Sequence, residues 1–122
     1  MEKTWGYHYH YDVTGCDRDA MKSKEIVTRW IKDLVKRIDM VPIGEPFVEY
    51  IAMDQDDKAG ITAVQVIVTS SITAHFIDST GDIYLDVFSC KPFDLNTVKE
   101  IVEEYFKPTK CVELFMTRQA PR

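Results

Sequence analysis

The sequence lacks the features that mark membrane-spanning, secreted and duplex-binding proteins. No apolar run approaches the roughly 20 residues that span a bilayer. A signal peptide needs an apolar core, and none is present in the first residues, MEKTWGYHYHYD. The formal net charge is −5, whereas proteins that bind nucleic-acid phosphates are more often basic. We therefore expect a cytoplasmic protein that binds neither nucleic acid nor a membrane.

Cysteine is scarce as well. Cys16, Cys90 and Cys111 are an odd number, and no two of them form a CxxC pair. This pattern favours neither a disulfide framework nor a structural zinc site. What is present is enough apolar material for a core: 45% of the 122 residues are hydrophobic. We expect one domain over residues 1–122.

Hydrophobic periodicity predicts strands interrupted by two helices. Apolar residues recur at helical spacing from about Ser23 to Ile38 and again from Leu95 to Phe106, with Asp94 as the N-cap of the second helix. Strands are predicted over residues 5–13, 46–52, 61–68, 83–90 and 111–117. The segment 71–77, SITAHFI, is either a continuation of strand 61–68 or the next strand after a kink.

This order favours an α+β fold, a two-layer sandwich of a mainly antiparallel sheet with two helices on one face. Strand 61–68 is apolar on both of its faces, which is typical of a strand covered on both sides. A second copy of the chain would cover the free face of the sheet. We therefore expect a homodimer in which two chains form a four-layer αββα arrangement.

The first predicted strand has a polar face made of His8, His10 and Asp12, since alternate residues share a face. These residue types bind metals, but one strand supplies at most part of a coordination sphere, and no fourth ligand is evident. The pattern is more typical of the polar face of a half-buried strand, and we expect no metal.

The stretch Thr69–Phe76, TSSITAHF, puts three hydroxyls at the end of an apolar run and a histidine five residues after the second. By themselves, Ser70 and Ser71 are typical turn residues, and His75 is typical of a satisfied core or interface histidine. Cys90, at a strand end, is typical of a small buried hydrophobe.

A set of motifs in one order changes this interpretation. They resemble those of the small prokaryotic S-adenosylmethionine decarboxylases, pyruvoyl-dependent enzymes of spermidine synthesis, and the resemblance covers nearly the whole chain. The family's glycine–any–histidine strand is matched by Gly6-Tyr7-His8, and its GCD loop by Gly15-Cys16-Asp17. Its GVSGV strand resembles Gly60-Ile61-Thr62-Ala63-Val64, and its SHLTIH segment resembles Ser70-Ser71-Ile72-Thr73-Ala74-His75. Its DVFTC motif resembles Asp86-Val87-Phe88-Ser89-Cys90.

The resemblance implies that the chain cuts itself between Thr69 and Ser70. In the family, the serine hydroxyl attacks the preceding carbonyl, the resulting ester is eliminated, and the new amino terminus becomes a pyruvoyl group. That carbonyl then accepts the substrate's amine and acts as an electron sink while carbon dioxide leaves. The cofactor would be this pyruvoyl group, made from Ser70, and the substrate S-adenosylmethionine or a related small molecule.

The resemblance also assigns roles to other residues. His75 is the base for the elimination, and Thr62 and Thr69 support processing, Thr62 by keeping a hydroxyl where the family has serine. Cys90 returns a proton to the substrate after decarboxylation, a task that suits a thiol.

Candidate substrate contacts come from two further positions. Phe47 lies where the family places an aromatic residue that stacks on the substrate, and Ser71 directly follows the processing serine. Trp5 and Phe76 also have rings that could stack on adenine, although such aromatics are more often packing residues.

Next to the processing serine the chain departs from the family pattern: Thr69 replaces glutamate and Ser71 replaces histidine. Further on, Ile77 and Asp78 stand where the family often has tryptophan and proline. These departures keep other hypotheses open. One is a pyruvoyl-dependent decarboxylase of ornithine or arginine. Others are an unprocessed regulator that binds S-adenosylmethionine, and a lyase or hydrolase that attacks it without a pyruvoyl group. An intact mass separates these classes, because only processing yields two fragments.

Overall fold

The computed structural model describes residues 4–52 and 54–122. In this part of the chain, six strands form one sheet in the order β2-β3-β4-β5-β1-β6, and all neighbours are antiparallel. The strands are β1 (Gly6–Thr14), β2 (Phe47–Ile51), β3 (Gly60–Ile67), β4 (Ser70–Ile77), β5 (Asp82–Ser89) and β6 (Lys110–Arg118). The helices are α1 (Arg18–Met21), α2 (Lys24–Arg37) and α3 (Leu95–Phe106), with a 3₁₀ turn, η1, at Asp56–Lys58.

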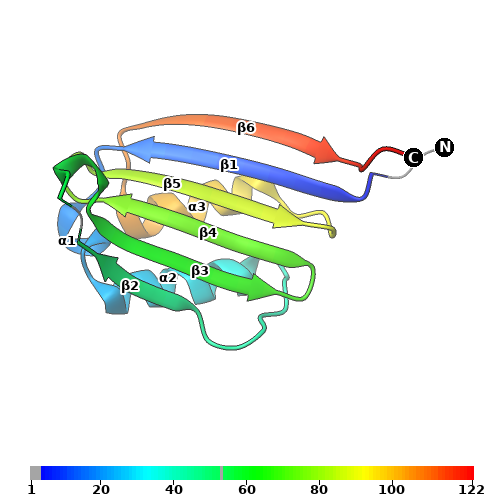
Figure 1. The fold of residues 1–122 in the computed structure, drawn as a ribbon, viewed down its shortest axis with the longest axis horizontal. Helices are drawn as coiled ribbons and strands as arrows, with labels where there is room; N and C mark the ends of the chain where they lie inside the picture. The colour runs from blue at the N-terminus through cyan, green and yellow to red at the C-terminus, as the bar shows by residue number, and fades with distance from the viewer. Residues whose placement is uncertain (1–3, 53) are drawn as a thin grey trace.

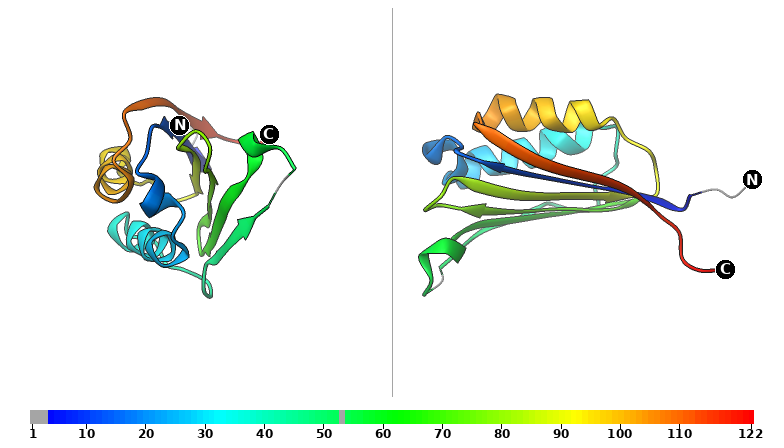
Figure 2. Two further views of the ribbon diagram at one scale, coloured as in Figure 1. Left: turned by 90° about the vertical axis from the view of Figure 1, so that its left-hand side faces the viewer. Right: turned by 90° about the horizontal axis from the view of Figure 1, so that it is seen from above.

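The two long helices lie on the same side of the sheet, as the two views in Figure 2 show. The predicted two-layer α+β sandwich is therefore confirmed (Figure 1). None of the helices among the described residues is long and apolar enough to cross a membrane.

Helix α2 begins where Ser23 caps it, since the Ser23 hydroxyl accepts a hydrogen bond from the Ile26 N–H. Asp94 caps α3 in the predicted way, accepting from the N–H groups of Asn96 and Thr97. The apolar stripes of both helices face the sheet, and Trp30 packs edge-on against Phe76 of β4.

The stretch between the first strand and the first long helix shows neither a strand period nor a helix period in the sequence, which favours a loop. In the structure it contains the short helix α1, so a loop is the wrong prediction there. The Asp17 carboxylate accepts hydrogen bonds from the N–H groups of Asp19 and Ala20 and so starts this turn. A four-residue helix spans too few residues to show a period, which is why periodicity missed it.

The segment 71–77 belongs to a new strand and does not continue the previous one. Strands β3 and β4 form a hairpin closed by Val68 and Thr69, with Ile67 opposite Ser70. The next turn, between β4 and β5, contains Gly81 at φ +76°, where a Cβ would collide with the Arg18 guanidinium.

The two faces of the sheet differ sharply in burial. On β1, Tyr9 and Tyr11 are buried beneath the helices, while His8 and His10 face the other way, as period two predicts. The uncovered side, which we call the open face, carries exposed apolar side chains on several strands. Examples are Val66 (49% exposed), Val112 (69%), Leu114 (51%) and Met116 (46%).

Candidate active site

The predicted processing residues lie at the tip of the β3–β4 hairpin. Thr69 occupies the turn, and Ser70 is the first residue of β4, half-buried and opposite Ser89 of β5. Cys90 follows directly after β5 and is exposed. The sheet therefore brings Ser70 and Cys90 together although twenty positions separate them in the sequence.

The backbone of Cys90 makes a contact of chemical interest. Its N–H donates a hydrogen bond of 2.9 Å to the carbonyl oxygen of Thr69. That carbonyl belongs to the peptide bond that the Ser70 hydroxyl would attack. A donor on this oxygen withdraws electron density from the carbonyl carbon and stabilises the negative charge that develops during attack.

Thr62 and His75 form a second group at the opposite end of the hairpin. They face each other across β3 and β4, and their Oγ1 and Nδ1 atoms are 3.2 Å apart. His75 is five residues along β4 from Ser70, which corresponds to about 16 Å between their Cα atoms at the usual rise of a strand. Within one chain, His75 therefore cannot reach Ser70.

A cavity of about 550 Å³ opens beside His75 on the open face. Tyr84 lies opposite His75 in the sheet, and its hydroxyl donates to the Asp82 carboxylate at 3.3 Å. Partial burial acts to raise the pKa of Asp82, but hydrogen bonds, chiefly from Thr14, outweigh it and hold the pKa below its usual value. The charge of Asp82 in turn raises the pKa of Tyr84, which keeps the phenol protonated.

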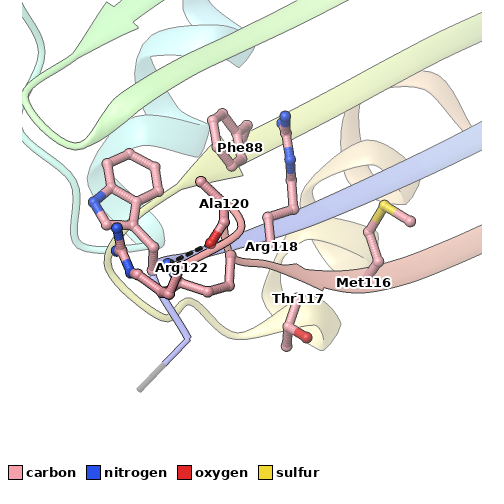
Figure 3. Close-up of a pocket in the computed structure, with 8 residues that line it drawn as sticks. Phe88, Met116, Thr117, Arg118, Ala120 and Arg122 are labelled. Carbon is pink, nitrogen blue, oxygen red and sulfur yellow. Dashed lines mark hydrogen bonds between the residues drawn. The ribbon is translucent and has the colours of Figure 1, made fainter. Parts of the chain in front are cut away.

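A second cavity, of about 680 Å³, lies near the Ser70 end, where the two chain termini leave the sheet (Figure 3). Its walls include Trp5, Phe88 and Arg118, and the Arg118 guanidinium lies 4.2 Å from the centre of the Phe88 ring. Phe88 is directly opposite Ser71, so this cavity adjoins the residue after the processing serine. An aromatic wall beside a cation can receive a flat ring or an anionic group.

The predicted substrate contacts lie apart from each other. Ser71 is on β4 at the Ser70 end of the sheet, whereas Phe47 is on the edge strand β2, half exposed and opposite Val64. The structure does not bring Phe47 and Ser71 together in one chain. Phe76, the other ring considered, is buried against Trp30 and Phe106 in the core.

The polar residues of β1 pair with carboxylates. His8 Nε2 lies 3.0 Å from Asp86, and His10 Nδ1 lies 3.4 Å from Asp12. Among the described residues, no three His, Cys, Asp or Glu side chains are grouped in a way that could hold a metal ion.

Sequence reasoning missed several residues near these groups. Phe88 and Ser89 belong to the motif that contains Cys90, so their nearness to Ser70 could have been inferred from strand pairing. Tyr84 follows from the same pairing, since it is opposite His75. Met40, which contacts the Thr69 hydroxyl, carries no such signal because it lies 29 positions away in an irregular segment.

Comparison with known proteins agrees with this arrangement. The model of the family described as S-adenosylmethionine decarboxylase matches residues 7–119. Two S-adenosylmethionine decarboxylase proenzymes of Clostridium botulinum, from strains Langeland and Loch Maree, are 26% and 27% identical over 112 residues, covering 89% of this chain and 91% of theirs. The crystal structure of the adenosylmethionine decarboxylase from Aquifex aeolicus VF5 has the same fold, with a TM-score of 0.78, 21% identity, and coverage of 99% of this chain and 96% of that one.

Proposed function

Because the chain belongs to the S-adenosylmethionine decarboxylase family, we propose that it is a proenzyme that cuts itself between Thr69 and Ser70 and then decarboxylates S-adenosylmethionine. The product would serve spermidine synthesis in the cytoplasm, as the family's chemistry implies. The observation that carries the proposal is the contact at the hairpin tip, where the Cys90 N–H binds the carbonyl that Ser70 must attack.

The first step exchanges an amide for an ester. The Ser70 Oγ bonds to the carbonyl carbon of Thr69, the C–N bond between the two residues breaks, and the Ser70 nitrogen becomes a free amine. The Cys90 N–H stabilises the oxyanion formed on the way. A base then removes the Ser70 α-proton, and the Cβ–O bond breaks, which leaves Thr69 with a free carboxylate. Water replaces the nitrogen of the remaining fragment, ammonia leaves, and the amino terminus at position 70 is a pyruvoyl group.

The base in this scheme is His75, and it has to come from a second copy of the chain. About 16 Å of strand separates it from Ser70 within one chain. If two open faces pack with their strands reversed about a twofold axis, the Thr62–His75 pair of one copy meets the hairpin tip of the other, with its Thr69–Ser70 bond and Cys90. The Thr62 hydroxyl, 3.2 Å from His75 Nδ1, fixes the orientation of the ring. The proposed homodimer would thus bury the exposed apolar side chains and complete two active sites.

The residues at the hairpin tip suit a pyruvoyl group, since Ser70 can supply it and Cys90 is its neighbour across the sheet. When present, that group withdraws electrons from the substrate's α-carbon during loss of carbon dioxide. Cys90 would hold a proton at Sγ and deliver it to the substrate. Ser71 and Phe47, from opposite protomers, would contact the bound substrate from two sides.

The test is to purify the protein, measure its intact mass and assay release of labelled carbon dioxide. We expect fragments 1–69 and 70–122, the second with a pyruvoyl terminus, and release from S-adenosylmethionine in preference to ornithine or arginine. A protein that stays full-length after long incubation at neutral pH would rule out the proposal. Fragments that release carbon dioxide only from ornithine or arginine would keep the processing and overturn the substrate.

A further inference from the structure

Thr69 accepts two hydrogen bonds from residues at the end of β5. Its carbonyl oxygen accepts from the Cys90 N–H, and its hydroxyl oxygen accepts from the Ser89 hydroxyl at 2.7 Å. One contact fixes the backbone of the residue before the scissile bond and the other fixes its side chain. Two adjacent residues of one strand end therefore determine the orientation of the Thr69–Ser70 peptide.

The side-chain contact belongs to a longer series of hydrogen bonds. The Lys91 N–H donates to the Ser89 Oγ at 3.0 Å, Ser89 donates to Thr69, and the Thr69 hydroxyl donates to the Met40 Sδ at 3.3 Å. The Ser89 Oγ also lies 3.6 Å from the Met40 Sδ, so the two hydroxyls and the thioether form one cluster in which the shortest contact is the one between Ser89 and Thr69. The thioether at its end is a weak acceptor, so the Thr69 hydroxyl depends chiefly on Ser89 for its position.

The middle of this series lies inside the protein, on the helix side of the sheet, while Thr69 is half-buried and Lys91 is exposed. Ser89 is completely buried, and Met40 is 7% exposed. Water is therefore poorly placed to replace a lost hydroxyl, and hydrogen bonds in such surroundings hold their geometry well. The self-cleavage step needs a defined approach of Ser70 Oγ to the Thr69 carbonyl carbon, and small errors in that approach are costly to the rate.

We propose that Ser89 is a positioning residue for self-cleavage, whose buried hydroxyl holds the Thr69 side chain so that the carbonyl at the scissile bond stays on the Cys90 amide. This inference rests on the proposed function, since it presumes that the Thr69–Ser70 bond is cut. It accounts for a threonine at position 69: a short β-hydroxyl reaches Ser89 directly.

The experiment follows the rate of chain cleavage on gels after a short cell-free synthesis of each variant. We expect Ser89→Ala and Thr69→Val each to slow cleavage about 10-fold, the amount that one buried hydrogen bond supplies. Because both remove the same contact, the double variant should be no slower than the slower single one. Ser89→Thr, which keeps the hydroxyl, should restore most of the rate, and Thr97→Val on α3 should cleave like the parent chain.

A purely structural role would give a different set of results. Urea unfolding of each variant in a Ser70→Ala background, where no cleavage can occur, reports how far the change affects folding alone. Cleavage of both Ser89→Ala and Thr69→Val at the parent rate would overturn the inference while leaving the proposed function intact. So would rate losses that multiply in the double variant, or losses matched by equal destabilisation. If the parent chain itself is never cleaved, both the inference and the proposed function fail.

Discussion

The two faces of the sheet differ in burial and in the kinds of side chain that they carry. The helix-covered face buries a continuous apolar core that includes Trp30, Leu34 and Phe106, and this burial supplies most of the folding free energy. The open face carries the histidine–carboxylate contacts, the Thr62–His75 pair and the exposed valines. The apolar core therefore lies on one side of the sheet, and the histidines with their polar partners lie on the other.

A second contrast lies between the two ends of the β3–β4 hairpin. At the Ser70 end, backbone hydrogen bonds hold the residue before the scissile bond, whereas at the His75 end an exposed side chain is held by one threonine hydroxyl. One end provides the bond to be broken and the other provides the base. In our account neither end is an active site until a second copy supplies the missing half.

The largest expected difference between the two faces is in the free energy of unfolding that is lost when a leucine is replaced by alanine. Leu34→Ala, in α2, should lower the free energy of unfolding by about 2–5 kcal/mol, because it leaves a cavity in a fully buried site. Urea denaturation in a Ser70→Ala background would measure this without interference from cleavage.

Leu114→Ala is the matched change on the open face, where the leucine is 51% exposed. It should alter the unfolding free energy of the single chain by less than about 0.5 kcal/mol. It should instead raise the concentration at which dimers dissociate in analytical ultracentrifugation. The account would be contradicted if the two changes lowered the unfolding free energy equally and neither affected association. In that case the open face would not differ from the helix-covered face in what it stabilises.

The smallest expected effect concerns Asp82, beside the His75 cavity. Its pKa in the folded chain lies below the usual value, so its contribution to stability is present above the unfolded pKa of about 4 and is lost as the pH falls through the folded pKa. Since the side chain is partly exposed, we expect less than about 1 kcal/mol. In the Asp82→Asn variant, the unfolding free energy should decrease less than in the parent chain as the pH is lowered from about 5 to 2.

Thr14→Val removes the chief hydrogen-bond donor to Asp82 and should reduce that decrease in the same way. An unchanged pH profile in both variants would show that Asp82 is not the group responsible. The Leu34→Ala variant should be displaced to lower stability by a similar amount at every pH, since no ionisable group changes.

The sequence predicted features that depend on local period. Spacings of two and of three to four residues predicted the opposite orientations of neighbouring residues on β1 and the order of the long elements, and both were confirmed. The cap at Asp94 was predicted from the preference for aspartate at a helix start, and it was confirmed as well. The resemblance identified Ser70, His75 and Cys90 as a set, but the roles of these residues remain predictions.

Contacts between distant segments could not be inferred in this way. The contact of Met40 with Thr69 depends on how the segment after α2 packs under the hairpin, and no period encodes it. The separation of Ser70 from His75 became clear only when residues 70–77 proved to be one extended strand. That separation is the reason why we propose a site built from two chains, an arrangement that the family resemblance also implies.

The most direct test of this central claim mixes two inactive variants. Ser70→Ala chains and His75→Ala chains, distinguished by mass tags, should each remain uncut when made alone. When they are made together, the His75→Ala chains should be cut in mixed dimers, where their Ser70 meets an intact His75, so that about half of them are cleaved if pairing is random. If the His75→Ala chains are cut when alone, or stay uncut in the mixture although mixed dimers form, the two-copy active site is contradicted.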